Sequence, residues 1–451
     1  MSSIDLNPQF LLALEAVENS SKHLFITGRA GTGKSTLLEY VRSHTAKKYV
    51  VAAPTGVAAL NVHGETIHSL FMFWPNISLE EAKKQAFKAR KKKQLFQNLE
   101  LLIIDEISMV RADLLDCVDI FLQTIRENTE PFGGVRVLCF GDLYQLPPVV
   151  RSDELGALEQ IYTSPYFFHS HVFERLQENT TNMFGFIELE IIYRQKDQSF
   201  IDFLNGIRDK TISAEELEKL NARCLPDLDL HSLPEHTIIL TARNDQADFI
   251  NTKLLAELHD DSITFDADSS GDFERASYPT DLSVTVKPGA RVMFVNNDSS
   301  KRWVNGTMGT VFGEYEEENG DGDEPILGLI IELDSGEQVE VTPYTWELSR
   351  SYFSENTKTI EREVVGTFTQ IPLRLAWAVT IHKSQGKTFE RIVVDLGRGA
   401  FTTGQTYVAL SRCVSLEGLY LARPLKASDV RLDTRIVQYL TSLQYLLPEK
   451  K

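Results

Sequence analysis

Short apolar runs recur through the first part of the chain, and each run ends in a polar or glycine-bearing loop. Amphipathic stretches with helical spacing separate these runs. The alternation is typical of strands that are buried in a parallel sheet and covered by helices. We therefore predict an α/β domain over residues 1–185, whose strands include Leu24 to Ile26, Val50 to Ala52, Leu101 to Ile104 and Val135 to Leu138.

A second set of apolar runs lies further along the chain, at Thr237 to Leu240, Ile392 to Leu396 and Leu419 to Leu421. Residues 282–365 have a different pattern, because turn sequences such as Asn305-Gly306 separate short alternating strands. We expect a small β-barrel there. It would be inserted into a second α/β domain made of residues 186–281 and 366–451.

The composition supports a multi-domain protein, since 451 residues with 42% hydrophobic content can bury more than one core. The four cysteines are scattered without a CxxC pair, which argues against a disulfide framework and a zinc site and fits a reducing compartment. The sequence contains neither a signal-like N-terminus nor an apolar run of membrane-spanning length. We expect a soluble intracellular protein.

The formal net charge of −18 disfavours a protein that coats nucleic acid by bulk attraction. Any DNA site must therefore be local. One dense basic stretch, residues 83–93, has the pattern of a helix. It could touch a phosphate backbone, but a solvated helix face is the favoured interpretation.

The segment from Gly28 to Ser35 is a complete phosphate-binding loop between an apolar strand and a helical run, which is the context this motif requires. Backbone N–H groups at the start of the helix can cradle phosphates, Lys34 can reach the β- and γ-phosphates, and Ser35 can bind Mg²⁺. We predict an ATP site with the cofactor-binding residues Gly28, Ala30, Gly31, Thr32, Gly33, Lys34, Ser35 and Thr36.

An acidic pair follows the predicted strand that ends at Ile104. Asp105 is placed to bind the metal together with Ser35, and Glu106 is placed to polarise the attacking water. Alone the pair would be an ordinary strand end, and its position downstream of the loop favours the catalytic interpretation. A phosphate-binding loop and an acidic strand end would also fit a kinase or an ABC-type ATPase. These two features therefore do not identify the reaction.

The segment Cys139 to Val149 narrows the reaction, because it resembles motif III of superfamily 1 helicases. In that motif a glutamine, here Gln145, senses the γ-phosphate. A Pro-Pro-Val edge, here with Pro148 and Val149, meets single-stranded DNA. The stretch upstream, which contains Pro131 to Val135, resembles the signature of Pif-family helicases.

Further motifs of this family follow in the family's order, so that the resemblance runs from about Leu6 to Leu421. The matches are Asn7 to Gln9 with the Q motif, Pro54 to Ala59 and Ile67 to Phe71 with the Ia region, Tyr193 to Gln195 with motif IV, Trp377 to Gly386 with motif V, and Tyr407 to Arg412 with motif VI. The resemblance implies that Gln9 binds adenine and that Gly386 contacts the nucleotide. It also implies that Arg194 and Arg412 reach the γ-phosphate across a cleft as arginine fingers.

The family implies two RecA-like parallel-sheet motor domains, an SH3-like barrel at residues 282–365, and a small wedge insertion at about 61–78 in the first domain. It implies ATP and Mg²⁺ as cofactors. The expected catalytic residues are Lys34, Asp105, Glu106, Gln145, Arg194 and Arg412. The expected DNA contacts are Thr55, Gly56, His63, Thr66, His68, Phe71, Pro148, Val149, Lys301, Trp303, His382 and Lys383.

Some alternatives stay open from the sequence. Trp303 could stack on a base or fill the barrel core, and the aromatic run Phe71 to Pro75 could form the wedge or pack in the core. The chain could unwind DNA or displace proteins without separating strands, whereas a P-loop phosphotransferase is disfavoured because no second-substrate motif appears.

The sequence and this resemblance together predict an ATP-dependent 5′-to-3′ DNA helicase in genome maintenance, cytoplasmic and associated with the nucleoid. It would act on single-stranded DNA and on tailed or forked duplexes, with G-quadruplexes and RNA–DNA hybrids as further candidate substrates. We expect a monomer in isolation.

Overall fold

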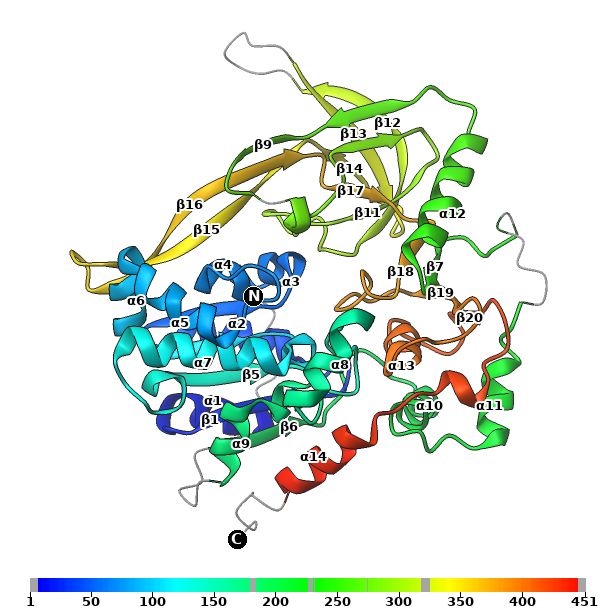
Figure 1. Ribbon diagram of the computed structural model, residues 1–451. Coiled ribbons are helices and arrows are strands. Elements are labelled where there is room, and N and C mark those ends of the chain that lie inside the picture. The colour runs from blue at the N-terminus through cyan, green and yellow to red at the C-terminus, as the bar shows by residue number, and fades with distance from the viewer. Residues whose placement is uncertain are drawn as a thin grey trace. The chain divides into compact units, whose positions relative to one another are not determined.

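The computed structural model describes residues 7–178, 184–225, 230, 232–273, 275–317 and 325–444. The chain divides into two compact units (Figure 1). Unit 1 contains residues 1–193, 348–365 and 433–451, and unit 2 contains residues 194–347 and 366–432. This division differs from the three predicted domains, because the segments 348–365 and 433–451 group with the first α/β domain.

A six-stranded parallel sheet forms the centre of unit 1. Its strand order is β3-β2-β4-β5-β1-β6. The strands are β1 (His23–Gly28), β2 (Tyr49–Ala53), β3 (Glu65–Thr66), β4 (Leu101–Ile104), β5 (Arg136–Phe140) and β6 (Phe184–Leu189). Four of the strands are those predicted from apolar runs. The predicted boundary at residue 185 falls inside β6, which the sequence pattern did not reveal.

The sheet has apolar residues on both faces, because alternate side chains of a strand point to opposite sides. In β4, Leu101 and Ile103 share one core with Leu37, which lies on the helix Lys34–His44. Leu102 and Ile104 share another core with Phe121. The helices of unit 1 are α1 (Pro8–Asn19), α2 (Lys34–His44), α3 (Gly56–Asn61), α4 (Ile67–Phe71), α5 (Leu79–Lys88), α6 (Lys93–Asn98), α7 (Ala112–Arg126), α8 (Ser152–Ile161), α9 (His171–Glu178) and α14 (Thr434–Gln444), with the 3-10 turns η1 (Arg90–Lys92), η2 (Ile107–Met109), η3 (Pro131–Gly134) and η4 (Phe167–His169).

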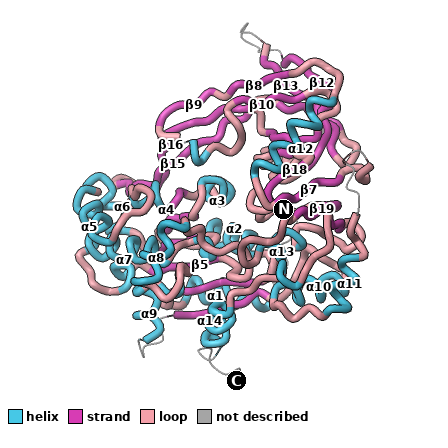
Figure 2. The backbone as a smooth tube through the Cα atoms, turned by 45° about the vertical axis from the view of Figure 1, so that its right-hand side comes forward, coloured by secondary structure: helices cyan, strands magenta, loops and turns pink. Residues whose placement is uncertain are grey.

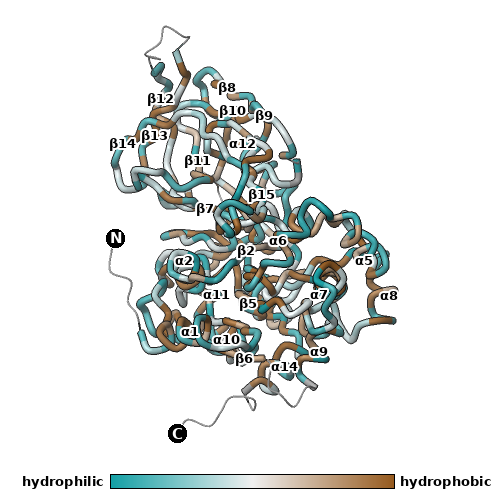
Figure 3. The backbone as a smooth tube through the Cα atoms, turned by 90° about the vertical axis from the view of Figure 1, so that its left-hand side faces the viewer, coloured by the Kyte–Doolittle hydropathy of each residue, from teal (hydrophilic) through white to brown (hydrophobic). Residues whose placement is uncertain are grey.

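The basic stretch at residues 83–93 is helical, as predicted, and spans α5, η1 and the start of α6. A capping box between Ser78 and Glu81 starts α5. Figure 3 colours most of α5 as hydrophilic. Lys92 differs from its neighbours, because it is buried and lies 3.5 Å from a carboxylate oxygen of Glu65.

Unit 2 contains a four-stranded parallel sheet of order β18-β7-β19-β20. Its strands are β7 (Thr237–Thr241), β18 (Ala378–Thr380), β19 (Arg391–Asp395) and β20 (Leu419–Leu421). Three of them match the predicted second set of apolar runs. The helices of this unit are α10 (Gln198–Arg208), α11 (Ala214–Asn221), α12 (Asn244–Glu257) and α13 (Gln405–Leu410), with η5 (Arg275–Ser277) and η6 (Ala427–Asp429).

The remaining strands are antiparallel and belong to unit 2, except for the parts of β15 and β16 that lie in unit 1. Figure 2 shows β8, β10, β12 and β13 close together. One sheet has the order β14-β13-β12-β11-β17, a second pairs β10 with β8, and a third has the order β15-β16-β9. The strands are β8 (Ile263–Asp266), β9 (Asp268–Gly271), β10 (Ser283–Val286), β11 (Arg291–Phe294), β12 (Met308–Glu317), β13 (Ile326–Leu333), β14 (Gln338–Val341), β15 (Tyr344–Ser354), β16 (Thr359–Gln370) and β17 (Leu373–Leu375). The β-rich region thus begins before residue 282 and continues past residue 365. The chain passes between the units within β15 and β16.

Among the described residues, none of the helices has the length and apolar character that crossing a membrane requires.

Candidate functional site

The strand order of unit 1 brings three motif loops to one edge of the sheet. Strands β4, β5 and β1 are neighbours and run parallel, so the loops after their carboxyl ends lie side by side. These loops carry the phosphate-binding segment after Gly28, the acidic pair after Ile104 and the segment from Gly141 to Gln145.

The phosphate-binding loop depends on two glycines. Gly33 has φ +86° at the N-cap of α2, a left-handed conformation that side chains rarely adopt. At Gly28 a Cβ atom would lie 2.6 Å from the carbonyl oxygen of Leu189. The Lys34 ammonium donates to the carbonyl oxygens of Gly28 (2.6 Å) and Arg29 (3.0 Å). The loop thus holds the lysine over itself, where an anion can take over those contacts.

The acidic pair lies beside this lysine. Burial raises the pKa of Asp105 to about 6, while a backbone hydrogen bond at Glu106 and the charge of Lys34 act in the opposite direction. A carboxylate that burial drives toward the neutral form gains from a bound cation. Ser35 is exposed in the first turn of α2. The donors Asp105 and Ser35 therefore fit a hard cation such as Mg²⁺. Glu106 has φ +49°, a strained conformation of the kind found at functional sites.

Gln145 is held in place by the loop after β5. Its side-chain amide donates to the carboxylate of Asp142 (3.2 Å), and its backbone N–H donates to the Asp142 carbonyl oxygen (3.0 Å). Both residues are buried. Of the predicted Pro-Pro-Val edge, Pro148 is buried and Val149 is exposed, so Val149 is the side chain that can meet a ligand.

The Q-motif residues connect helix α1 to the phosphate-binding loop. The Gln9 side chain donates to the Glu190 carboxylate (2.8 Å) and accepts from the Glu190 backbone N–H (2.8 Å). The Asn7 amide donates to the Tyr193 hydroxyl (2.8 Å), and the backbone N–H of Tyr193 donates to the carbonyl oxygen of Gly31 (2.9 Å). Gln9 and Tyr193 are therefore fixed next to the loop.

Strands β2 and β3 bring the Ia residues to the same sheet edge. Thr55 follows β2 and caps α3, and Thr66 ends β3 and caps α4. His68 is half-buried, whereas His63 is exposed, with φ +46°. Partial desolvation of the imidazole lowers the pKa of His63, and the charge of Arg42 lowers it further by a smaller amount.

The structure corrects the prediction that Phe71 contacts DNA. Phe71 is fully buried and packs against the rings of Phe73, Phe96 and Phe121. Phe73 is also buried, so of this aromatic run Trp74, 44% exposed, is the ring that a ligand can reach. Core packing, the alternative left open by the sequence, explains Phe71.

In unit 2 the guanidinium of Arg412 is buried in a cage of oxygen atoms. Its Nε donates to the carbonyl oxygen of Val408 and its Nη2 to the hydroxyl of Ser411, both at 2.9 Å. Its Nη1 lies 3.5 Å from the carbonyl oxygen of Ser384 and 3.3 Å from that of Lys387. The motif V segment therefore supplies part of the environment of the motif VI arginine.

Arg194 and Gln195 attach to the same segment. The Arg194 guanidinium donates to the carbonyl oxygen of Ser411 (3.1 Å), and the Gln195 amide donates to the carbonyl oxygens of Ser411 (3.2 Å) and Cys413 (2.8 Å). Burial lowers the pKa of Arg194. Motifs IV, V and VI thus form one hydrogen-bonded group within unit 2. Gly386, with φ +80°, is exposed in motif V.

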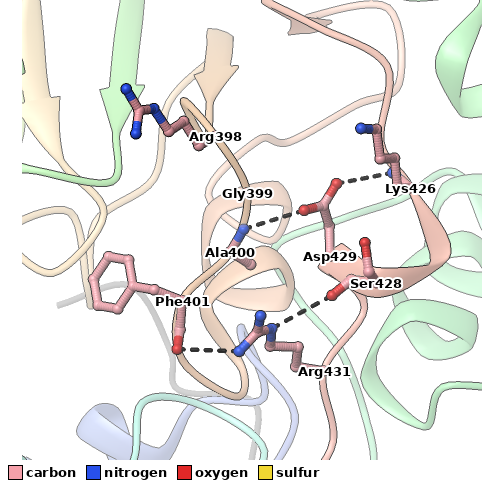
Figure 4. A pocket seen from close by; sticks show the side chains of 8 residues that line it. All are labelled: Arg398, Gly399, Ala400, Phe401, Lys426, Ser428, Asp429 and Arg431. Atoms are coloured by element: carbon pink, nitrogen blue, oxygen red, sulfur yellow. Dashed lines mark hydrogen bonds between the residues drawn. The ribbon is translucent and has the colours of Figure 1, made fainter.

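A hollow of about 380 Å³ in unit 2 is lined in part by Phe401, whose ring stacks near His382 of motif V. Arg398, Lys426 and Arg431 contribute cations to its lining (Figure 4). The Phe401 ring points away from Asp429 in Figure 4, is 56% exposed, and is nearly parallel to His382, with 6.4 Å between ring centroids. Lys383 is exposed next to His382.

The loop after β11 contains two residues that were predicted to contact DNA, and the structure places them differently. Lys301 is exposed. Trp303 is 5% exposed, stacks on Phe294 (4.4 Å between centroids), and donates to Asn296 (3.0 Å). Its place in the core of the antiparallel sheets corrects the prediction of a base-stacking ring, because Phe294 stacks on this ring and the Arg302 guanidinium lies over it.

The comparisons with known proteins agree with these motifs. The sequence profile of the PIF1-like helicase family matches residues 9–218. The chain is 32% identical, over 92% of its own length, to the ATP-dependent DNA helicase Pif1 of Psychrobacter sp., of which it spans 67%. The chain belongs to the PIF1-like helicase family. Because the curated relatives are ATP-dependent DNA helicases, this PIF1-like helicase is an ATP-hydrolysing enzyme of that class.

Solved structures give this PIF1-like helicase an α/β RecA-like fold. The crystal structure of Bacteroides sp. Pif1 in complex with ADP-AlF4 is 35% identical and has a TM-score of 0.85, with 98% of this chain and 97% of that chain covered. The crystal structure of Bacteroides Pif1 bound to ssDNA is 34% identical and has a TM-score of 0.66, with coverage of 98% and 97%.

Three residues of this helicase that hold predicted site residues in place were not predicted from the sequence. Asp142 holds Gln145, Glu190 holds Gln9, and Lys387 contributes a carbonyl oxygen to the Arg412 cage. Asp142 lies inside a recognised motif and could have been suspected from it. Glu190 gave no signal, because its contact joins positions 181 residues apart.

The corrected role of Phe71 can be tested in the helicase by stability. We expect Phe71→Ala to lower the free energy of unfolding by about 3–5 kcal/mol, because it leaves a cavity in a fully buried aromatic cluster. Urea denaturation measures this loss. The exposed neighbour gives the matched control, since Trp74→Ala should change stability much less. A Phe71→Ala protein of unchanged stability with weak DNA binding would contradict the core assignment.

Proposed function

We propose that the chain moves 5′ to 3′ along single-stranded DNA by Mg²⁺-dependent ATP hydrolysis and separates duplex strands ahead of it. The observation that carries the proposal is the shared sheet edge of unit 1. It places the phosphate-binding loop, the acidic pair and Gln145 next to the loops that carry Thr55 and Thr66. A sheet edge that carries both sets of loops is suited to couple the nucleotide state to a grip on DNA.

The proposed mechanism gives a role to each residue of the site. Lys34 binds the β- and γ-phosphates, Ser35 and Asp105 hold Mg²⁺, and Glu106 orients the attacking water. Gln145 senses the γ-phosphate, Gln9 recognises adenine, and Gly386 contacts the nucleotide. Arg194 and Arg412 offset the negative charge of the transition state. Bound Mg²⁺ would supply charge neutralisation on the phosphate oxygens.

The proposed DNA contacts are exposed or half-buried residues, and all but Gly56 and Val149 have polar or charged side chains. In unit 1 they are Thr55, Gly56, His63, Thr66, His68 and Val149, and in unit 2 they are Lys301, His382 and Lys383. The Bacteroides Pif1 structure bound to ssDNA supports a single strand as the ligand. The exposed ring of Phe401 beside His382 extends the proposed path with a stacking surface.

We expect Phe401→Ala to weaken single-strand binding by about 1–3 kcal/mol, the usual contribution of one base stacked on an aromatic ring. Fluorescence anisotropy with a labelled oligothymidine measures the change. Phe249→Ala is the matched control, because that ring is 68% exposed on α12 of the same unit. Equal losses in the two variants would exclude a specific role for Phe401.

The finer architecture belongs to the proposal too. The antiparallel strands of unit 2 are proposed to form the SH3-like accessory barrel, and the insertion that contains Trp74 is proposed to form the wedge. Duplex DNA is the proposed substrate, with G-quadruplexes and RNA–DNA hybrids as further candidates. A cytoplasmic, nucleoid-associated location follows from a chromosomal DNA substrate.

The test compares ATP hydrolysis without nucleic acid and with single-stranded DNA, duplex DNA or RNA, followed by unwinding of duplexes with a 5′ or a 3′ tail. We expect stimulation by single-stranded DNA and opening of the 5′-tailed duplex. Hydrolysis indifferent to DNA would overturn the motor function, and selective opening of the 3′-tailed duplex would reverse the polarity.

The second candidate function is a translocase that displaces proteins without separating strands. Release of streptavidin from a biotinylated oligonucleotide, combined with an intact 5′-tailed duplex, would favour that function.

A further inference from the structure

The Arg412 guanidinium is held unevenly. Its Nε and Nη2 make hydrogen bonds of 2.9 Å, whereas Nη1 is held by contacts of 3.3 and 3.5 Å to the carbonyl oxygens of Lys387 and Ser384. Hydrogen bonds weaken as they lengthen beyond about 3.2 Å. Among these contacts those of Nη1 are therefore the weakest, and the direction of Nη1 depends on where the Lys387 backbone lies.

The side chain of Lys387 connects this backbone to the barrel loop. Its ammonium donates to the side-chain oxygen of Asn305. Its methylene groups pack against Gly306, where a Cβ atom would lie 3.3 Å from the Cγ of Lys387. One residue therefore touches the motif VI arginine through its carbonyl group and the barrel loop through its ammonium group.

The barrel loop is a firm anchor for that ammonium. The backbone N–H of Asn305 donates to the side chain of Asn297 (2.8 Å), and the backbone N–H of Gly306 donates to the carbonyl oxygen of Phe294 at the end of β11 (2.9 Å). These two hydrogen bonds fix the backbone around Asn305, so a displacement of the loop would also displace the side-chain oxygen that binds Lys387.

We propose that Lys387 is a positioning residue for Arg412 and that it couples ATP hydrolysis to the barrel loop around Asn305. The proposal rests on the arginine-finger role of Arg412 given under the proposed function. Lys387 touches neither nucleotide nor DNA in this scheme. It sets the carbonyl cage that orients the guanidinium in advance, and such preorganisation determines how well a charged group stabilises a transition state.

The charge of Lys387 gives the coupling a measurable signature. Burial and then the nearby charge of Arg374 lower the pKa of Lys387 to about 7. The groups that face it from neighbouring elements are the cations Arg374 on β17 and Arg412 after α13, and the neutral amide of Asn305. A charged ammonium donates a stronger hydrogen bond than a neutral amine. The bond to Asn305 therefore weakens as pH rises through about 7, and kcat is expected to fall with it.

The test measures kcat and KM for single-strand-stimulated ATP hydrolysis from pH 6 to 9 in the full chain. Lys387→Met keeps the length of the side chain and removes the donor. We expect it to lower kcat at pH 6.5 about tenfold, with KM for ATP and Kd for DNA changed less than about twofold. It should also remove the decrease of kcat above pH 7.

Asn305→Asp is the decisive partner variant, because a carboxylate beside the ammonium raises the pKa of Lys387. We expect it to move the alkaline decrease of kcat to higher pH, a shift that a purely structural role would not produce. Lys219→Met is the control, since that lysine is exposed on α11 and pairs with Glu215. Thermal melting identifies any variant that fails to fold. If Lys387→Met does not fold, the pH profile of Asn305→Asp alone decides whether Lys387 has the positioning role.

The outcomes distinguish failure of the positioning role from failure of the proposed function. Wild-type kcat and pH profile in Lys387→Met, or an unmoved profile in a folded Asn305→Asp, would overturn the positioning role while the wild-type chain still hydrolyses ATP in response to DNA. A wild-type chain without DNA-stimulated hydrolysis would overturn the proposed function, and the positioning role with it.

Discussion

Replacing Lys34 by alanine is expected to lower the rate of ATP hydrolysis by about 10²–10³-fold or more, the usual cost of losing one charged donor at a transferring phosphoryl group. The ammonium of Lys34 is already positioned over the loop by the carbonyl oxygens of Gly28 and Arg29. Its removal takes away the cation that would bind the β- and γ-phosphates. A steady-state assay of phosphate release with saturating single-stranded DNA measures the effect.

Binding of single-stranded DNA should survive this change, because the proposed strand contacts of unit 1 come from the loops after β2 and β3. Lys84→Ala offers a control in the same unit, since that lysine is exposed on α5 and pairs with Glu80. If Lys34→Ala lost DNA binding and kept hydrolysis, its assignment to the phosphates would be wrong. Lys34→Met separates loss of charge from loss of side-chain length.

Replacing Arg412 is expected to have an effect at least as large. Arginine fingers contribute about 10³–10⁵ in kcat, and Arg412 is 1% exposed with all three guanidinium nitrogens engaged. Arg412→Lys keeps the charge but loses the planar fork, so we expect it to recover little of the rate. Single-turnover hydrolysis with pre-bound ATP isolates this step from nucleotide binding.

The Arg412 variants need a stability measurement, because truncation removes a buried donor that contacts the carbonyl groups of Val408, Ser384 and Lys387. Arg243→Ala is a suitable control, as that guanidinium is exposed and pairs with Asp245. A folded Arg412→Lys enzyme with nearly normal single-turnover kinetics would show that the arginine holds the segment together and does not act on the phosphate.

The parts of the site that could be predicted are those in which one short segment contains its own geometry. The loop from Gly28 to Ser35 places backbone N–H groups, a lysine and a hydroxyl within one turn, so its chemistry follows from local sequence. Buried parallel strands also identify themselves, because they are apolar on both faces, as β4 illustrates. Strand β6 escaped detection, since its pattern includes Gly185 and Glu188 and its pairing partner β1 lies far away in sequence.

The aromatic residues show where local sequence stops being informative. Phe71, Phe401 and Trp303 are all large aromatic residues, yet two are buried and one is exposed. An aromatic side chain gains free energy from burial in a core or from stacking on a base, and the sequence around it is compatible with both. The distant residues that cover each ring decide between them.

The sequence by itself determined the nucleotide-binding loop, its acidic partners, the family and most of the buried strands, because each is specified by residues close together along the chain. The tertiary structure alone decided which sheet edge carries the loops and which aromatic rings stay accessible. It also decided how Arg412 is caged and that Lys387 joins this cage to the loop around Asn305. Those features depend on hydrogen bonds and packing between residues tens to hundreds of positions apart, which no local pattern records.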